Sequence, residues 1–278
     1  MNPATTHHRP GARDPFGPHL RYWRQMRRMS QLDLAHEAAL STRHLSCVET
    51  GRAAPSREVV LRLADRLDVP LRERNQLLVA AGYAPMYRQR GLDDPSMAAA
   101  RKAIDLLLKA HEPWPALAID RHWNLVAHNA VLPHLLLGLP AELLAPPINV
   151  LRLSLHPQGL APRIANLGPW RVHVLERLRQ QVEATGDATL QALRDELAAM
   201  ALPPGAEPAS HDQLGEALGG MVVPFQMHSP AGLLSFISTT TVFGTPVDVT
   251  LQEFALETFL PADAQTAAAM QALAQQQL

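Results

Sequence analysis

The sequence has almost no cysteine and no apolar run that suits a membrane. Cys47 is the one cysteine in 278 residues, so the chain has no intramolecular disulfide and fits a reducing compartment. The most apolar stretch, residues 130–151, is broken by four prolines, a histidine and a glutamate. Residues 1–14 lack the apolar core of a secretory signal. We therefore expect a soluble, cytoplasmic protein without a membrane partner.

Motifs that support catalysis by a nucleophile or binding of a nucleotide are also absent. The chain contains no GxSxG, no GxGxxG after an expected strand, no GxxxxGK and no CxxC. His122, His128 and His134 are six residues apart, which matches neither one helix face nor a usual zinc motif. We therefore expect no catalytic residue, no metal and no resident cofactor, and we rank an enzyme below a binding protein.

Charge is distributed unevenly along the chain, although the formal net charge is only -1. Residues 1–85 hold 13 arginines and 8 acidic residues, a net charge of +5, and the remainder holds 12 basic and 18 acidic residues, a net charge of -6. A basic first part would attract phosphate to one domain. The length favours two domains. We expect a disordered tail at 1–15, an all-α domain at 16–85, a linker at 86–96 and a second domain at 97–278.

Apolar residues recur at helical spacing through the first domain. Ser30, with Asp33 three residues later, can cap one helix, and Ser41 and Ser56 can cap two others. Leu32, Leu34 and Ala35 would supply the buried side of the second helix. The predicted helices lie near 16–28, 31–38, 42–49, 56–67 and 71–81, and Gly82 ends the last.

The second domain mixes helices with β-branched and aromatic strands. A helix is predicted over 96–112, and WPALAID and HWNLVAH form a hairpin that turns at Asp120-Arg121. The segment TLQEFALETF fits a helix as well as a strand. Further predictions are a helix from Asn129, two helices over 169–199 broken at TGD, a proline-rich loop at 202–210, strands over 221–228, 232–243 and 249–259, and a helix from Asp263.

The third helix has a small polar face that is available to a partner. If Leu45 and Val48 face inward, small polar residues lie on the opposite face. The pattern RxxRxMSQxxLA, then ALSxRHLSxVExGRxxPS, resembles the helix-turn-helix of the Xre family from Phe16 to about Ala81. Arg24 and Glu49 match a pair that ties the first helix to the recognition helix in that family.

The resemblance implies a set of DNA contacts. Arg43 is the best equipped to read a base, because its guanidinium can bind guanine O6 and N7 together. Cys47 also fits a redox sensor, but we favour a packing or contact role for it. Base edges are expected at Thr42, Arg43, Ser46 and Cys47, the DNA backbone at Ser41, His44 and Arg52, and a phosphate and a base at Gln31.

The second domain resembles the PAS-like ligand-binding domain of MmyB-like transcription regulators. The hairpin WPALAIDRHWNLVAHN, then INVLRLSLHPQGLAPRIANLGPW and LLSFISTTTVFGTPVDVTLQEFALETFLPAD, stand in the same order in that family. The resemblance implies an apolar pocket for a fatty acyl chain or another small apolar ligand. The predicted fold is an all-α N-terminal five-helix helix-turn-helix domain plus an α+β PAS-like C-terminal domain.

Polar residues inside apolar runs are the candidate ligand contacts, and Arg152 could pair with a ligand carboxylate. Structural alternatives remain: Asn129 caps a helix, His156 forms a turn before Pro157, and Arg152 pairs with a surface acid. The candidate ligand-binding residues are Asn129, Arg152, His156 and Asn166, whereas Trp114, Trp123, Trp170, Phe236 and Phe243 are expected in the core.

These features together predict a transcription regulator rather than an enzyme. We expect a homodimer that binds an inverted-repeat operator in double-stranded DNA, with a second domain that senses an apolar ligand. The alternative is a DNA-binding regulator whose second domain only dimerises or docks a protein partner.

Overall fold

The computed structural model describes residues 10–11, 14–203, 223–244, 246 and 248–275. The chain separates into two compact units. The first unit contains the described residues up to Arg90 with two short later segments, and the second contains most of the described residues from Gly91 onward. We name them the DNA-binding unit and the ligand-binding unit after the functions that the sequence predicts. Most of the tail expected at 1–15 and of the loop expected at 202–210 lies outside the described residues.

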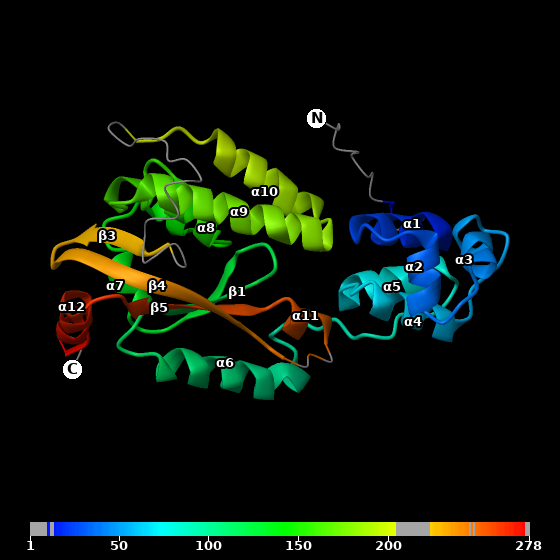
Figure 1. Ribbon diagram of the computed structural model, residues 1–278. Coiled ribbons are helices and arrows are strands. Elements are labelled where there is room, and N and C mark those ends of the chain that lie inside the picture. Colours follow the sequence, from blue (N-terminus) through cyan, green and yellow to red (C-terminus); the bar gives the residue numbers. More distant parts are fainter. Residues whose placement is uncertain (1–9, 12–13, 204–222, 245, 247, 276–278) are drawn as a thin grey trace. The chain divides into compact units, whose positions relative to one another are not determined.

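Five short helices form the first unit, as the sequence predicts (Figure 1). Ser30, Ser41 and Ser56 each accept a hydrogen bond from the backbone N–H three residues later, and Ser30 and Asp33 complete the expected capping box. The capping serines therefore fix where three of the helices begin. The helices are α1 (Phe16–Met26), α2 (Gln31–Glu37), α3 (Thr42–Glu49), α4 (Arg57–Arg66) and α5 (Leu71–Ala80).

The core of this unit lies between all five helices and includes Leu20, Leu34, Leu45 and Leu63, none of which is exposed. The prediction for Leu32 is wrong, because this side chain is 65% exposed. At about 100° per residue, Leu32 lies on nearly the opposite side of α2 from Leu34, so the two cannot share a buried face.

Close contact between α1 and α3 depends on a glycine. A Cβ at Gly17 would collide with the backbone carbonyl oxygen of Glu49, at the end of α3. The packing of α1 on α3 therefore requires the smallest residue at position 17.

The turn between α2 and α3 uses Ala39 in the left-handed region, at φ 52°.

The ligand-binding unit is built on one five-stranded antiparallel sheet of order β2-β1-β5-β4-β3. The hairpin of β1 and β2 forms as predicted. The segment at 249–259, which fitted a helix and a strand equally, divides into a helical turn, α11 (Val249–Gln252), and then a strand. The strands are β1 (Ala116–Ile119), β2 (Leu125–His128), β3 (Phe225–Ser229), β4 (Gly232–Val242) and β5 (Ala255–Pro261).

Helices cover both faces of this sheet (Figure 1). On one face Ile104 and Leu108 of α6 pack against Ala116 and Ala118, while Leu117 of β1 belongs to the large core on the other face. The α+β class of this unit is therefore confirmed. The helices are α6 (Ala98–Ala110), α7 (Leu132–Leu135), α8 (Val150–Leu155), α9 (Leu167–Thr185), α10 (Ala188–Ala199) and α12 (Ala264–Gln275), with 3-10 turns at Pro95–Met97, Ala141–Leu144 and Ala161–Arg163.

One predicted helix start needs correction. The helix expected from Asn129 begins only at Leu132 and is four residues long. Asn129 is 4% exposed and bonds to the backbone before β1 instead of capping α7. In the part of the chain that the structure describes, no helix is long and apolar enough to cross a membrane.

Candidate DNA-binding surface and ligand cavity

The candidate DNA contacts lie on the accessible side of α3 and beside it. Leu45 and Val48 are buried, as the sequence predicts, and they leave Arg43 exposed on the opposite face. Among the described residues no side chain forms an ion pair with Arg43, so its guanidinium is available to a base or a phosphate. Ser41, Thr42 and Arg52 are also exposed, and Gln31, His44, Ser46 and Cys47 are half-buried.

A buried ion pair fixes α3 to α1. Arg24 donates from Nε to Glu49 Oε1 at 2.6 Å and from Nη2 to Oε2 at 3.2 Å. The Glu49 side chain is not exposed, and that of Arg24 is only 12% exposed. A third hydrogen bond, from Arg24 Nη1 to the carbonyl oxygen of Met29 at 2.7 Å, holds the segment between α1 and α2. The predicted Arg24–Glu49 pair is therefore confirmed.

Gln31 also binds Glu49, and the sequence did not reveal this contact. Its Nε2 donates to Glu49 Oε2 at 2.7 Å. The residue is the first of α2, so Glu49 orients an amide at the helix start where the resemblance places a phosphate contact. Contact of Gln31 with DNA stays a prediction, and the structure adds the group that would position it.

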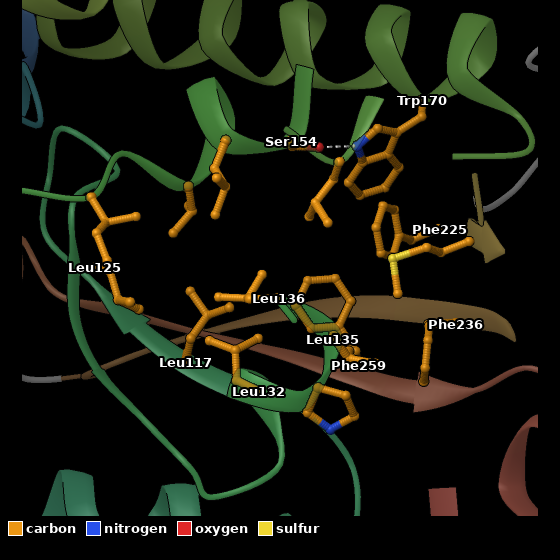
Figure 2. A pocket seen from close by; sticks show the side chains of 16 residues that line it. Leu117, Leu125, Leu132, Leu135, Leu136, Ser154, Trp170, Phe225, Phe236 and Phe259 are labelled. Atoms are coloured by element: carbon orange, nitrogen blue, oxygen red, sulfur yellow. Dashed lines mark hydrogen bonds between the residues drawn. The ribbon is translucent and has the colours of Figure 1, made fainter. Parts of the chain in front are cut away.

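An apolar cavity lies inside the ligand-binding unit, between the sheet and the helices α7, α8 and α9 (Figure 2). The empty space between its wall atoms amounts to about 640 Å³, including the part that is open to solvent. The centre of a water molecule can occupy only about 80 Å³ of this space. Because so little of the space admits even the centre of a water molecule, a ligand longer than a few atoms requires side chains to move. Its walls are Pro115, Leu117, Leu125, Leu132, Leu135, Leu136, Ile148, Val150, Leu153, Ser154, Leu160, Trp170, Phe225, Met227, Phe236 and Phe259.

Among the described wall residues, only Ser154 carries a hydroxyl or charged group, and it already has a hydrogen-bond partner. Trp170 donates from Nε1 to Ser154 Oγ at 2.9 Å, which is the dashed line in Figure 2. Trp170 and Phe236, which were expected in the core, line the cavity as well as being buried. Apolar walls of this kind stabilise a ligand by removing its apolar surface from water.

None of the four predicted ligand residues lines the cavity. Arg152 forms a bidentate pair with Glu196, with distances of 2.6 and 2.7 Å, and this hydrogen bonding raises the pKa of Arg152 and lowers that of Glu196. His156 Nδ1 accepts from Gln158 N–H at 3.1 Å within a turn. The structural alternatives therefore describe the observed contacts of Arg152 and His156.

The two predicted asparagines hold backbone segments together. Asn129 accepts from the N–H of Ala116 at 3.2 Å and donates to the carbonyl of Trp114 at 2.7 Å. Asn166 donates to the carbonyl of Pro224 at 2.8 Å and accepts from the N–H of Gln226 at 3.2 Å. Both amides thus tie the sheet to neighbouring loops, and the structure brings neither of them to the cavity.

A buried ion pair beside the cavity was not predicted. Arg177 of α9 donates to both oxygens of Glu257 of β5, at 2.8 and 3.2 Å, and to Thr240 Oγ1 at 2.7 Å. Its guanidinium also lies 4.7 Å from the centre of the Trp123 ring, where it gains a cation–π interaction. The residues are far apart in sequence, so no local pattern could reveal their contact.

Comparison with protein-family models assigns both parts of the chain. Residues 100–273 match the model described as the MmyB-like transcription regulator ligand binding domain, and residues 15–77 match a helix-turn-helix domain. No curated protein matches the sequence. The first match spans more than half of the chain, and both agree with the resemblances in the sequence.

Proposed function

The chain belongs to the MmyB-like transcription regulators, and from this we propose a homodimer that binds an inverted-repeat operator and whose DNA affinity is changed by a small apolar ligand such as a fatty acyl chain. The observation that carries the ligand class is the cavity, whose 16 wall residues include one serine and otherwise no hydroxyl or charged side chain. Since a ligand shifts an equilibrium only by its differential affinity, it must bind the two DNA-binding states unequally.

The proposal of a dimer rests on the small size of the recognition helix. Helix α3 has eight residues, and one such helix reads only a few base pairs. A two-fold dimer doubles that length and requires half-sites about one helical turn, ~10 bp, apart.

Arg43→Ala is expected to lose specificity, with a cost of about 1–3 kcal/mol on the operator, because the fork of the arginine can bind a guanine edge in two places. Arg52→Ala should weaken binding to all sequences alike, since it is expected to contact the backbone. The measurement is fluorescence anisotropy with operator and random duplexes at fixed salt. Equal losses for Arg43→Ala on the two duplexes would remove it from base reading.

Leu136→Trp is expected to fill the cavity and abolish the response to an apolar ligand. Leu136 is a half-buried wall residue, so the larger ring can be accommodated at low cost to folding. Saturating 1-decanol should change the DNA affinity of the intact protein by about tenfold, which corresponds to about 1.4 kcal/mol of coupling. Leu136→Trp should lose both decanol binding, measured by thermal shift, and the change in DNA affinity.

Leu106→Trp is the matched control, because Leu106 is 60% exposed on α6 and does not line the cavity. It should bind decanol and respond like the wild type. If decanol binds to Leu136→Trp as it does to the control, the cavity is not the ligand site. If neither decanol nor any molecule that copurifies binds to the wild type, the second unit serves only for assembly or partner docking.

A further inference from the structure

The segment of residues 86–90, which we call the strap, is bound to helix α5 of the DNA-binding unit. The side-chain amide of Asn75 accepts from two backbone N–H groups of the strap, at 2.9 and 3.0 Å, and donates to the carbonyl oxygen of Tyr87 at 2.7 Å. From the same helix, Arg72 Nη1 donates to the side-chain oxygen of Gln89 at 2.7 Å. These hydrogen bonds fix the strap to the body of the DNA-binding unit.

The strap also binds a short piece of the connection between β4 and β5, which belongs to the same unit. Arg90 Nε donates to Asp248 Oδ2 at 2.9 Å, and only 1% of the Asp248 side chain is exposed. Arg88 forms a parallel β-bridge with Asp248, and its carbonyl oxygen accepts from the N–H of Val249 at 2.9 Å. An ion pair and a backbone hydrogen bond therefore join the strap to the connection.

The ion pair between Arg90 and Asp248 contributes more to position than to stability. The cost of removing two charges from water offsets most of their attraction, so a buried pair adds little net stability. Pulling the partners apart is nevertheless costly, because the carboxylate of Asp248 stays inside the protein while its guanidinium leaves. The pair therefore makes the strap follow a movement of the connection.

The connection continues the two strands that form part of the cavity wall. Strands β4 and β5 are hydrogen-bonded neighbours, and the last pair of their ladder is Val242 with Ala255. Phe236 of β4 and Phe259 of β5 line the cavity. A ligand longer than a few atoms requires wall side chains to move, and two of these stand on the strands that lead to Asp248. Contiguous packed and hydrogen-bonded contacts of this kind can carry coupling between distant sites.

We propose that the pair between Arg90 and Asp248 transmits occupancy of the cavity to the DNA-binding unit, through the β4–β5 connection on one side and the strap and α5 on the other. This inference rests on the proposed function, because it assumes that a ligand in the cavity changes DNA affinity. It adds the route of that regulation. Neither residue lines the cavity or belongs to α3, so both are positioning residues that contact neither the ligand nor a base.

The test measures how far saturating 1-decanol changes the operator affinity of the full-length protein, by fluorescence anisotropy. The expected change for the wild type is about tenfold. Asp248→Ala breaks the pair and leaves Arg90, whose side chain is 25% exposed, within reach of water. It should reduce the change to about twofold or less, because the two sites are no longer coupled. Operator affinity without decanol, and decanol binding measured by thermal shift, should stay as in the wild type.

Arg90→Gln removes the other partner and should give the same loss of response. The variant with both substitutions should respond like either single variant, because all three lack the same contact. Asp65→Ala is the matched control: Asp65 lies on α4 of the same unit, where it pairs with Arg74 at 3.4 Å, and its side chain is 68% exposed. The control should respond to decanol like the wild type.

The outcomes separate this inference from the proposed function. If the wild type responds to decanol and the variants of the pair respond as the control does, the inference is wrong and the proposed function stands. If decanol does not bind to the wild type, or binds without changing its DNA affinity, the proposed function fails and the inference fails with it.

A measurement on the wild type decides the question even where a variant fails to fold. Hydrogen exchange of peptides that cover residues 86–90 is expected to change when decanol is added, since the strap follows the connection. Unchanged exchange of these peptides, in a sample whose DNA affinity does change, would contradict the proposed route.

Discussion

Glu49→Ala is expected to destabilise the DNA-binding unit by about 3–5 kcal/mol, because it leaves the guanidinium of Arg24 largely buried without its carboxylate. The Arg24 side chain is 12% exposed, and Gln31 loses its acceptor in the same change. A stability of roughly 5–15 kcal/mol is usual for a domain, so this loss removes a large part of it and, near the lower end of the range, unfolds the unit. DNA binding should fall with it, although we expect no contact between Glu49 and DNA.

The measurement is hydrogen exchange of peptides from residues 16–80 in the full-length protein at increasing urea, which gives the free energy of opening of this unit. Glu58→Ala is the control: Glu58 is paired with Arg62 on α4 but its side chain is 81% exposed, so a change of about 0.5 kcal/mol or less is expected. In a double-mutant cycle with Arg24→Met, a coupling energy near zero would contradict the account of the pair.

Arg177→Met is expected to destabilise the ligand-binding unit by a similar amount, about 3–5 kcal/mol. Glu257 is 4% exposed, so the substitution leaves a carboxylate inside the unit with Thr240 as its remaining hydrogen-bond partner. The cation–π contact with Trp123 is lost as well. Replacing both charges, in Arg177→Met with Glu257→Leu, should restore much of the stability, since no buried charge then lacks a partner.

Urea-dependent hydrogen exchange of β4 and β5 peptides reports this loss. Arg152→Met is the control, because its partner Glu196 remains hydrated after the change and the expected loss is at most about 1 kcal/mol. Equal losses of stability for Arg177→Met and Arg152→Met would show that burial of Glu257 contributes nothing to the cost of removing its partner. A double variant less stable than Arg177→Met would argue that the ion pair is not the source of the effect.

Local signals explain why the elements were largely predictable. Ser30, Ser41 and Ser56 mark helix starts by a rule that acts over three residues, and β-branched and aromatic residues mark most of the strands. The failure at Asn129 concerns a residue whose partners are distant in sequence. Asparagine often caps helices, but the side chain of Asn129 forms hydrogen bonds with the backbone of Trp114 and Ala116.

The candidate ligand site was less predictable than the recognition helix. Arg152 stands in an apolar run, and the sequence cannot show that it is paired with Glu196, 44 residues away. Wall residues and core residues are also chemically identical, so Trp170 and Phe236 carried no sign that they border empty space. By contrast, helix geometry alone identifies which face of α3 is accessible.

The void in the ligand-binding unit has a mechanical consequence. Unfolding eliminates internal voids, so the unfolded chain with its water occupies less volume than the folded one, and hydrostatic pressure favours it. The enclosed part of the cavity, walled by Leu117, Trp170 and Phe236 among others, adds to that volume change. A ligand that occupies the void should therefore reduce this volume change and make the unit less sensitive to pressure.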